Sequence, residues 1–297
     1  MTSLRLGTRR SPLAMVQAKE VRALLAANGV NAEIVPMTTS GDEGAPPGAS
    51  GLKGLWIDKI LEALEAGEID VAVHSAKDLP SDDSLHIAAV PERADARDVM
   101  VSRQLFLPPS ALIGTSSIRR RAQLLAGDKA LRFTDLRGNV GTRLRKVEEG
   151  EVDAAVLAAA GLWRLGLHPA HVTSLSVDVM VPAPGQGCLA LQTRPDDEQT
   201  IQTLLPLDHR PSHRALNAER TLVDLMGGGC DLPLGAYATA GGEGTIDMSA
   251  VVASTDGRLI LRVSIDGPDE RSVAERAAKS LVAAGATQIL DEIGKAP

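Results

Sequence analysis

Aromatic residues are scarce in this chain: phenylalanine, tryptophan and tyrosine together make up 2% of its 297 residues. Proteins that bind single-stranded nucleic acids stack the bases on aromatic rings, and so few rings offer little surface for stacking. The formal net charge of -7 points in the same direction, because affinity for nucleic acids comes chiefly from positive charge. The sequence therefore predicts no nucleic-acid partner.

Long hydrophobic runs are absent as well. No stretch approaches the roughly 18 consecutive apolar residues of a membrane-spanning helix. Residues 1–13 contain arginines but lack the apolar segment of a secretory signal, so we expect no membrane association and a cytoplasmic location. With 44% hydrophobic and 23% charged residues, the composition is that of a soluble globular chain, long enough for two or three domains.

Cysteine is limited to Cys188 and Cys230, which in a reducing compartment are expected to be free thiols. Cys188 lies in the apolar run 188–191, where a small buried side chain is expected. Cys230 follows three glycines, which open the backbone to close approach by another group. The six histidines are scattered and show no metal-ligand spacing, so no metal site is predicted.

Two interpretations of the glycines before Cys230 remain open from the tetrapeptide alone. Residues 211–226 have a helical pattern, and a glycine just past a helix end is the commonest cap. Under that interpretation Gly227 ends the helix, and the exposure of Cys230 is incidental. Under the other, the glycines make room for a bulky group bound to the thiol.

The chain also repeats itself. Residues 64–73 return 83 positions later as residues 147–156, and each copy reads as a helix end, a glycine cap and an apolar strand. Residues 6–11 and 113–119 match too, because each reads as a short strand that turns into a helix. The repeat predicts an α/β fold with two related lobes and mostly parallel sheets. Ligands of such sheets bind beyond the carboxyl ends of the strands.

Two joints separate the predicted lobes. Residues 90–98 lead into the second lobe and residues 181–187 lead out of it, and two crossings predict a hinged cleft. After residue 209, a helix, three apolar runs and a further helix predict a small three-stranded antiparallel sheet with helices on one face. The predicted division is residues 1–96 and 182–207 for lobe one, 97–181 for lobe two, and 208–297 for a C-terminal domain.

Basic residues gather in this otherwise acidic chain. Between residues 114 and 146, nine basic residues accompany two acidic ones, a local balance of +7. Some belong on a solvated helix face, but others lie in strand-to-helix turns, where free N–H groups, hydroxyls and guanidinium groups suit carboxylates or phosphates. No Walker pattern occurs, which favours a ligand with many carboxylates over a nucleotide. The candidate anion-binding side chains are Arg9, Ser11, Thr115, Ser117, Arg119, Arg120, Arg137 and Arg143.

One acidic residue stands within this basic setting. The apolar strand of the first repeat runs into a polar segment that places Ser75, Lys77 and Asp78 at the rim of lobe one. A carboxylate among arginines stays ionised, so Asp78 suits a developing cation or a pyrrole-type N–H. A turn position before Pro80 explains Asp78 equally well. His74 continues the strand and is expected to be a core residue with its hydrogen bonds satisfied.

Five motifs occur in order along the chain: HSAKDLP at 74–80, GTSSIRR at 114–120, LRGNVGTR at 136–143, GQG at 185–187 and GGC at 228–230. Together they resemble the porphobilinogen deaminase family, from about residue 4 to the C-terminus. The resemblance implies two lobes like those of type II periplasmic binding proteins and a third small α/β domain. It also implies a monomeric transferase that condenses four porphobilinogen molecules on a dipyrromethane cofactor, with loss of ammonia, and releases hydroxymethylbilane by hydrolysis.

The resemblance assigns roles to individual residues. Cys230 would hold the dipyrromethane by a thioether, and Asp78 would contact pyrrole N–H groups and stabilise the azafulvenium that forms as ammonia leaves. The residues expected to hold the cofactor are Arg9, Ser11, Lys77, Thr115, Ser117, Arg119, Arg120, Arg137 and Gln186. The residues expected to hold the substrate or the growing chain are Arg9, Lys53, Trp56, Ser75, Arg143 and Arg164.

Two positions depart from the family's pattern. Trp56 stands where phenylalanine is more frequent, and a larger ring can still stack over a pyrrole. Ala49 stands near a position where many members have lysine, so one anionic contact or the closure of its loop is expected to differ. Residues 43–50 are rich in glycine, proline and alanine, and we expect them to form a poorly ordered lid.

Two other functions fit parts of the sequence. A non-enzymatic anion-binding protein with two arginine-lined lobes would suit a dicarboxylate, but it gives no role to Cys230 or to the third domain. An acyl transferase with a cysteine nucleophile would need a histidine base near Cys230, and no histidine pattern suggests one.

Overall fold

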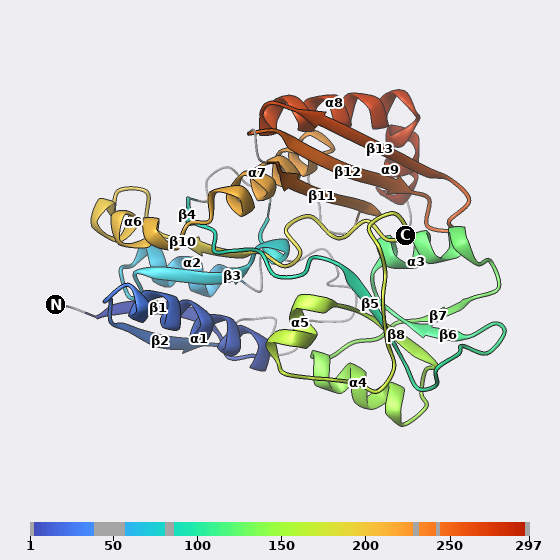
Figure 1. The fold of residues 1–297 in the computed structure, drawn as a ribbon, viewed down its shortest axis with the longest axis horizontal. Helices are drawn as coiled ribbons and strands as arrows, with labels where there is room; N and C mark the ends of the chain where they lie inside the picture. The colour runs from blue at the N-terminus through green and yellow to red at the C-terminus, as the bar shows by residue number, and fades with distance from the viewer. Residues whose placement is uncertain (1–2, 39–56, 81–85, 228–231, 242–243, 295–297) are drawn as a thin grey trace.

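Three β-sheets with packed helices make up the fold (Figure 1). The computed structural model describes residues 3–38, 57–80, 86–227, 232–241 and 244–294. Two of the sheets have five strands each, and the third has three. The three sheets occupy separate parts of the molecule, and the third lies at the top of Figure 1. Within the described residues, no helix is long and apolar enough to cross a membrane.

The first sheet has the strand order β2-β1-β3-β10-β4. Its strands are β1 (Leu4–Arg9), β2 (Ala32–Met37), β3 (Val71–Ser75), β4 (Ile87–Ala89) and β10 (Leu189–Gln192). Its helices are α1 (Pro12–Ala27), α2 (Asp58–Glu65) and α6 (Glu198–Leu204). All residues of β3 except the last are buried, as is typical of a strand covered on both faces.

The second sheet repeats this arrangement with the order β7-β6-β8-β5-β9. Its strands are β5 (Asp98–Ser102), β6 (Leu112–Gly114), β7 (Arg132–Thr134), β8 (Ala154–Ala158) and β9 (Val172–Ser174). Its helices are α3 (Ile118–Gly127), α4 (Val140–Glu148) and α5 (Ala159–Arg164). β8 has the same burial pattern as β3, its counterpart in the repeat. The predicted α/β fold with two related lobes is therefore confirmed.

The prediction of mostly parallel sheets is confirmed, because four of the five strands in each of the two sheets run in the same direction and one runs against them. β1 runs parallel to β2 and β3, whereas β10 runs antiparallel to β3 and β4. In the second sheet, β5 is likewise antiparallel to β8 and β9. β5 directly follows the first crossing and β10 directly follows the second, so each sheet receives an antiparallel strand from a segment that arrives from the other. The domain boundaries drawn from the sequence stay a prediction.

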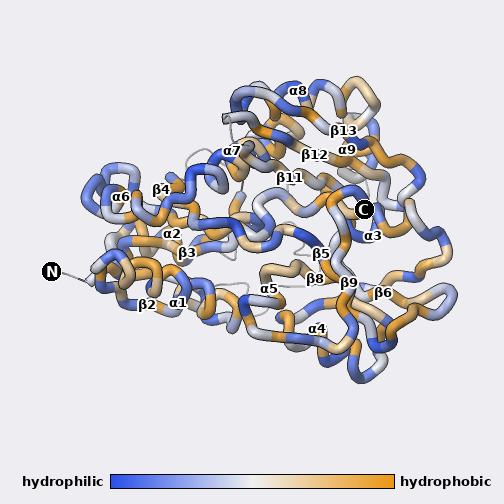
Figure 2. Tube along the Cα trace, in the orientation of Figure 1, coloured by the Kyte–Doolittle hydropathy of each residue, from blue (hydrophilic) through white to orange (hydrophobic). Residues whose placement is uncertain are grey.

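The third sheet is antiparallel, as predicted, with the order β11-β12-β13. Its elements are α7 (Arg210–Leu225), β11 (Leu234–Ala240), β12 (Ile246–Ala253), β13 (Ile260–Gly267), α8 (Glu270–Ala283) and α9 (Ala286–Gly294). The three helices and the inner face of the sheet share one apolar core. Hydrophobic and hydrophilic residues occur together along α8 (Figure 2), and its buried residues recur every three to four positions, as in a helix with one buried face. α9 was not predicted.

The end of α7 confirms the cap interpretation of Gly227. The helix ends at Leu225, and Gly227 has a φ of 95°, in the left-handed region that glycine occupies without strain. Cys230 lies outside the described residues, as do Lys53, Trp56 and the predicted lid at 43–50.

Candidate active site

A pocket lies where the first two sheets face each other, at the carboxyl ends of β3 and β8. The first lobe contributes Leu13, Gln17, Ser75 and Lys77 to its lining, and the second crossing contributes Gln186 and Gly187, followed by Cys188. The second lobe contributes Arg120, Val140, Arg143, Leu157, Ala158, Ala160, Gly161 and Arg164. Five sequence-predicted residues of both lobes thus lie around one pocket, with a sixth from the crossing. Its position follows the rule for sheets of this kind.

Ser75 ends β3 and is hydrogen-bonded to Gln17 of α1. Gln17 Nε2 donates to Ser75 Oγ at 2.8 Å, and Ser75 Oγ lies 3.1 Å from Gln17 Oε1. Gln17 is 4% exposed, and the sequence reasoning missed it. The available signal was weak, because a glutamine inside an amphipathic helix is ordinarily a surface residue.

Lys77 and Asp78 lie on a single 3-10 turn, Ala76–Asp78, directly after β3. Lys77 is half-buried and lines the pocket, whereas Asp78, the next residue on the turn, is exposed. Burial lowers the pKa of Lys77 to about 8, partly against the attraction of Asp78. The turn thus places a cation that lines the pocket directly before an exposed anion.

His74 is a buried residue of β3, as predicted, but its hydrogen bonding is incomplete. Burial lowers its pKa to about 4, so the imidazole is neutral at pH 7. Its Nε2 has no hydrogen-bond partner among the described residues, which contradicts the expectation of a satisfied side chain.

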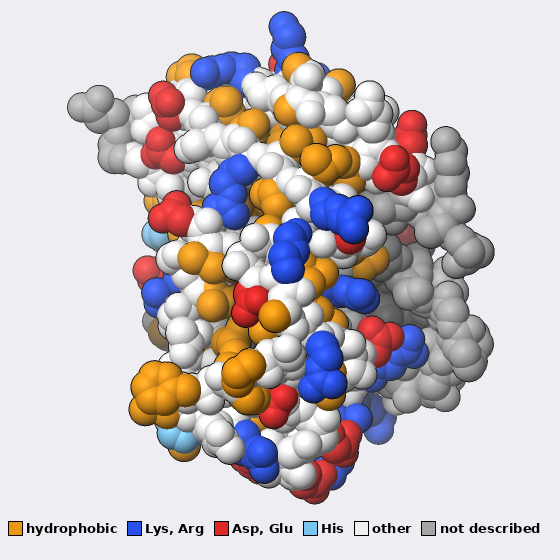
Figure 3. Space-filling view, turned by 90° about the vertical axis from the view of Figure 1, so that its right-hand side faces the viewer, with side chains coloured by type: hydrophobic (Ala, Val, Ile, Leu, Met, Phe, Trp, Pro, Cys, Tyr) orange, Lys and Arg blue, Asp and Glu red, His pale blue; other side chains and the backbone are white. Residues whose placement is uncertain are grey.

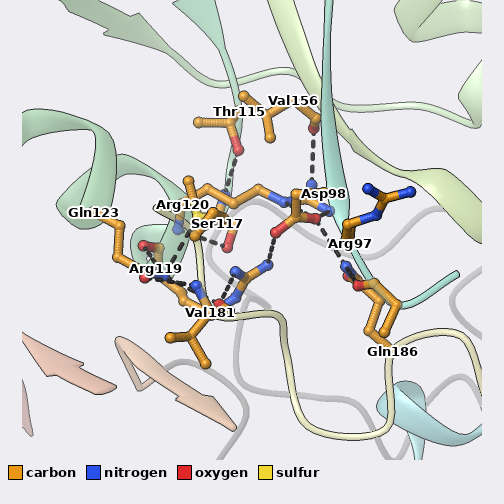
Figure 4. A network of polar contacts seen from close by, with 12 residues as sticks. Arg97, Asp98, Thr115, Ser117, Arg119, Arg120, Gln123, Val156, Val181 and Gln186 are labelled. Atoms are coloured by element: carbon orange, nitrogen blue, oxygen red, sulfur yellow. Dashed lines mark hydrogen bonds and ion pairs between the residues drawn. The ribbon is translucent and has the colours of Figure 1, made fainter. Parts of the chain in front are cut away.

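A buried polar network supports the second lobe and the crossings (Figure 4). Its centre is Asp98, the first residue of β5, which is fully buried. Arg119 Nη2 donates to Asp98 Oδ2 at 2.8 Å, and Arg120 Nη2 donates to Oδ1 at 2.8 Å. Gln186 Nε2 donates to the same Oδ1 at 2.9 Å. Arg119 also donates to Val181 O at 2.6 Å, which ties α3 to the second crossing.

Within this network, the negative charge of Asp98 and the positive charges of Arg119 and Arg120 stabilise one another. Burial alone would raise the pKa of Asp98, but Arg119 and Arg120 outweigh it and hold that pKa well below its usual range. Two predicted anion-binding arginines are therefore already paired with a carboxylate that the sequence reasoning missed. Arg120 also lines the pocket, so it can contact a ligand while Asp98 holds it in place. Direct contact of Arg119 or Arg120 with the cofactor stays a prediction.

We expect Asp98→Asn to destabilise the protein strongly. The substitution leaves two buried guanidinium groups without their counter-charge, and breaking a buried ion pair costs about 3–5 kcal/mol. Asp95→Asn is the matched control, because Asp95 pairs with Arg97 in the same crossing at 2.7 Å, with side chains 27% and 48% exposed. That exposed pair is worth about 1 kcal/mol or less. Denaturant unfolding measures both, and equal losses would contradict the assigned role of Asp98.

The predicted hydroxyl ligands act as local supports of the two helices that begin near the pocket. Ser11 Oγ accepts from Ala14 N at 3.3 Å and caps α1, and Ser117 Oγ accepts from Arg120 N at 3.4 Å and caps α3. Thr115 Oγ1 accepts from Ser117 N at 3.2 Å. These bonds use acceptor positions and leave each hydroxyl hydrogen able to donate to an anion.

The remaining predicted arginines differ in placement. Arg9 ends β1 and is half-buried, and Arg137 is exposed. Arg143 lines the pocket, and its Nε donates to Gly138 O at 2.8 Å. Arg164 lines the pocket from α5 and pairs with Glu20 at 2.9 Å. The structure thus brings Arg143 and Arg164 together with Lys77, Ser75 and Gln186, and it leaves Arg137 outside the pocket lining.

The two crossings pack closely against each other beside the pocket. Ala94 N donates to Gly187 O at 3.2 Å, and Gln186 Nε2 donates to Ala96 O at 2.7 Å. Gly187 has a φ of 90°, and a Cβ there would clash with Ala94 O. The glycine of the Gly-Gln-Gly motif is therefore required by the backbone at this point.

Glu219 of α7 connects both crossings to the third domain. It is fully buried, and its carboxylate accepts from Arg93 at 2.6 Å, from Gly185 N at 2.6 Å and from Ala238 N at 2.7 Å. Arg93 belongs to the first crossing, Gly185 to the second and Ala238 to β11. This carboxylate therefore fixes the helix that leads to Cys230 relative to the pocket.

Cys188 is a buried thiol at the base of the pocket. It is 1% exposed, and burial raises its pKa to about 12. The expectation of a small buried side chain is confirmed. A thiol with such a pKa supplies almost no thiolate at pH 7, so Cys188 is poorly suited to covalent chemistry.

Comparison with known proteins identifies the family. The family model described as porphobilinogen deaminase, dipyromethane cofactor binding domain, matches residues 4–202, and the model of the porphobilinogen deaminase C-terminal domain matches residues 214–284. The porphobilinogen deaminase of Acidithiobacillus ferrooxidans is 44% identical over 304 residues, which cover 99% of both chains. That of a Roseiflexus species is 46% identical over 268 residues, covering 87% of this chain and 88% of the relative.

A solved structure with a similar outline is a nutrient binding protein from Burkholderia cenocepacia. It has a TM-score of 0.42 and 14% identity, over 71% of this chain and 93% of that one. Sequence relatives match at 40–46% identity over 87–100% of this chain. This chain belongs to the porphobilinogen deaminase family.

Proposed function

We propose that the pocket between the two lobes is where this chain carries out the family's reaction, with Asp78 at the reacting centre and Cys230 as the anchor of the cofactor. The chain is a transferase of tetrapyrrole biosynthesis. It condenses four porphobilinogen molecules head to tail with loss of ammonia, and hydrolysis then releases hydroxymethylbilane. The dipyrromethane, when bound, supplies the free pyrrole position to which the first substrate unit is joined.

The residues of the pocket suit a group with several carboxylates and pyrrole N–H donors. Lys77, Arg143 and Arg164 supply positive charge from three elements. Gln186 supplies an acceptor, because its Nε2 is committed to Ala96 O and Asp98, which leaves Oε1 facing away. That Oε1 is buried and accepts no hydrogen bond within the described part of the chain. A pyrrole N–H can donate the hydrogen bond that Gln186 Oε1 otherwise lacks.

The placement of Asp78 carries the mechanistic proposal. Its carboxylate is exposed, on the turn that follows β3, while Lys77, Arg143 and Arg164 are half-buried and line the pocket. The cations hold acetate and propionate groups, and the carboxylate accepts the pyrrole N–H groups. Loss of ammonia leaves a positive charge on the substrate ring, and a fixed negative charge nearby lowers the energy of that step.

The assignment of the anchor follows from comparing the two thiols. Cys188 is buried with a raised pKa, so it is a poor nucleophile. Cys230 follows the glycine that ends α7, and Glu219 of the same helix is bonded to both crossings. The end of this helix, three residues before Cys230 in the chain, is therefore fixed relative to the pocket.

We further propose that the protein acts as a monomer in the cytoplasm, with neither nucleic acid nor membrane as a partner. The net charge of -7 supports the absence of a nucleic-acid partner. Basic and acidic side chains are interspersed over the face shown in Figure 3, which is not the continuous basic surface that nucleic-acid binding needs.

Mass spectrometry of the purified protein tests the proposed function. We expect the intact chain to be heavier than its sequence by two pyrrole units, and we expect digestion to place that mass on the peptide containing Cys230. Added porphobilinogen should be consumed to give a linear tetrapyrrole while the extra mass stays on the protein. An unmodified chain that consumes porphobilinogen at a normal rate would falsify the proposed anchor.

A further inference from the structure

The two lobes touch directly at α1 and α5, beside the pocket. Gly161 of α5 faces Leu13 of α1, since a Cβ at this glycine would lie 3.6 Å from Leu13 Cδ2. About two helical turns further along α1 and one turn further along α5, Glu20 and Arg164 form an ion pair. This pair is a polar contact between the two lobes.

Arg164 binds the Glu20 carboxylate in a bidentate arrangement. Arg164 Nε donates to Glu20 Oε2 at 2.9 Å, and Nη2 donates to Oε1 at 3.4 Å. Arg164 Nη1 donates to Gly187 O at 3.3 Å, in the second crossing. One guanidinium group thus contacts lobe one and the crossing while it lines the pocket. Its side chain is 9% exposed, so solvent plays little part in setting its position.

The Glu20 carboxylate occupies the position on Arg164 that a ligand carboxylate would take. A guanidinium fork binds any carboxylate in the same planar geometry, whether it belongs to a side chain or to a ligand. Among the described residues, Asp98 and Glu20 are the acidic groups paired with the arginines that line the pocket. Asp98 is fully buried and cannot exchange, whereas the side chain of Glu20 is 37% exposed and can turn into solvent.

We propose that Glu20 is a positioning residue that substitutes for a substrate carboxylate: it holds Arg164 across the two lobes until an acetate or propionate group of the substrate or growing chain displaces it. The proposal rests on the proposed function, in which Arg164 binds such a group. Before substrate arrives, the pair keeps α1 against α5 and gives the buried guanidinium a partner. Once the ligand carboxylate takes its place, the contact between α1 and α5 loses this link.

Competition between Glu20 and a ligand carboxylate for Arg164 lowers the apparent affinity of the ligand. A ligand must break the Glu20 pair to reach Arg164, so its apparent affinity is reduced by the fraction of time that Arg164 is occupied. Glu20→Gln removes the negative charge, keeps the shape, and weakens the competitor. We therefore expect binding to tighten by about two- to fivefold, the factor that corresponds to a partly exposed ion pair.

The test uses the holoenzyme and a non-reacting ligand. The ligand is a pyrrole that carries the acetate and propionate groups of porphobilinogen but lacks the aminomethyl group, so no ammonia can leave. Calorimetry gives its Kd for the wild type, Glu20→Gln, Arg164→Gln and the double variant. Glu33→Gln is the matched control, since it is an exposed glutamate on β2 of the same lobe. KM and kcat for porphobilinogen are measured on the same proteins.

We expect Glu20→Gln to lower both the Kd and the KM, with kcat changed by less than about twofold, and Glu33→Gln to change none of them. In the Arg164→Gln background, Glu20→Gln should have no effect, because the competitor has no partner. If Glu20→Gln leaves the Kd unchanged or raises it while Arg164→Gln weakens binding, the displacement idea is wrong and Arg164 still binds substrate. If Arg164→Gln leaves the Kd unchanged, the role of Arg164 in the proposed function is wrong, and the inference about Glu20 is lost with it.

Discussion

Cys230→Ala is expected to give a protein without the dipyrromethane adduct and without turnover of porphobilinogen. The thioether is the single covalent link between protein and cofactor in the proposed mechanism, and alanine has no atom with which to form it. The remaining thiol cannot take over, because Cys188 is 1% exposed and its pKa is raised to about 12. Intact mass and a porphobilinogen consumption assay measure both losses.

Cys188→Ala is the matched control for this prediction. It removes the other thiol from the base of the pocket, at a cost of about 1 kcal/mol for one lost buried atom. We expect it to keep the full adduct mass and to turn over porphobilinogen at a rate close to that of the wild type. A Cys230→Ala protein that still carries the adduct, or a Cys188→Ala protein that lacks it, would reverse the assignment of the two thiols.

Much of the fold was predictable because the same local signals for a helix end, a glycine cap and a strand occur in both copies of the repeat. Residues 64–73 and 147–156 end a helix, turn at a glycine and enter a strand buried on both faces, and the structure has β3 and β8 at these places. Glycine caps and continuous apolar runs are local signals, so the sequence alone reveals them. The antiparallel placement of β5 and β10 was missed, because pairing between segments far apart in the chain has no local signal.

The sequence predicted which types of residue line the site, but it did not predict which acidic residues pair with the arginines. Arginines in strand-to-helix turns indicated anion binding, and Lys77, Arg143 and Arg164 do line one pocket. The sequence offered no means of seeing that Asp98 would neutralise Arg119 and Arg120, since it lies 21 residues before the first of them. Glu20 was missed for the same reason: its partner is 144 residues away.

The two acidic residues that the sequence did not reveal, Asp98 and Glu20, pair with different arginines of the site and give those arginines different functions. Asp98 is buried with two arginines, so that part of the charge supports the crossing and the start of β5. The pair of Glu20 and Arg164 is partly open to solvent, so its cation can change partner. Lys77 and Arg143 also line the pocket, and we expect them to hold ligand carboxylates. A count of basic residues alone could not separate these groups.

Asp78→Asn should keep the cofactor and lose most of the turnover, with kcat reduced by about 100- to 1000-fold, as when one preorganised stabilising group is removed from an active site. Asparagine keeps an oxygen that accepts a pyrrole N–H, so the ligand can still bind. It lacks the negative charge that opposes the positive charge formed as ammonia leaves. The effect should therefore appear in kcat more than in KM, which identifies a group that acts in the transition state.

Asp58→Asn provides the comparison for Asp78→Asn, since Asp58 is an exposed aspartate that starts α2 in the same lobe. Both substitutions remove one exposed negative charge, so both should leave the free energy of unfolding within about 0.5 kcal/mol of the wild type. Intact mass should show the adduct in both proteins, which separates loss of chemistry from loss of the cofactor. A kcat for Asp78→Asn within threefold of that for Asp58→Asn would remove Asp78 from the reacting centre, and the interpretation as a simple turn residue before Pro80 would then stand.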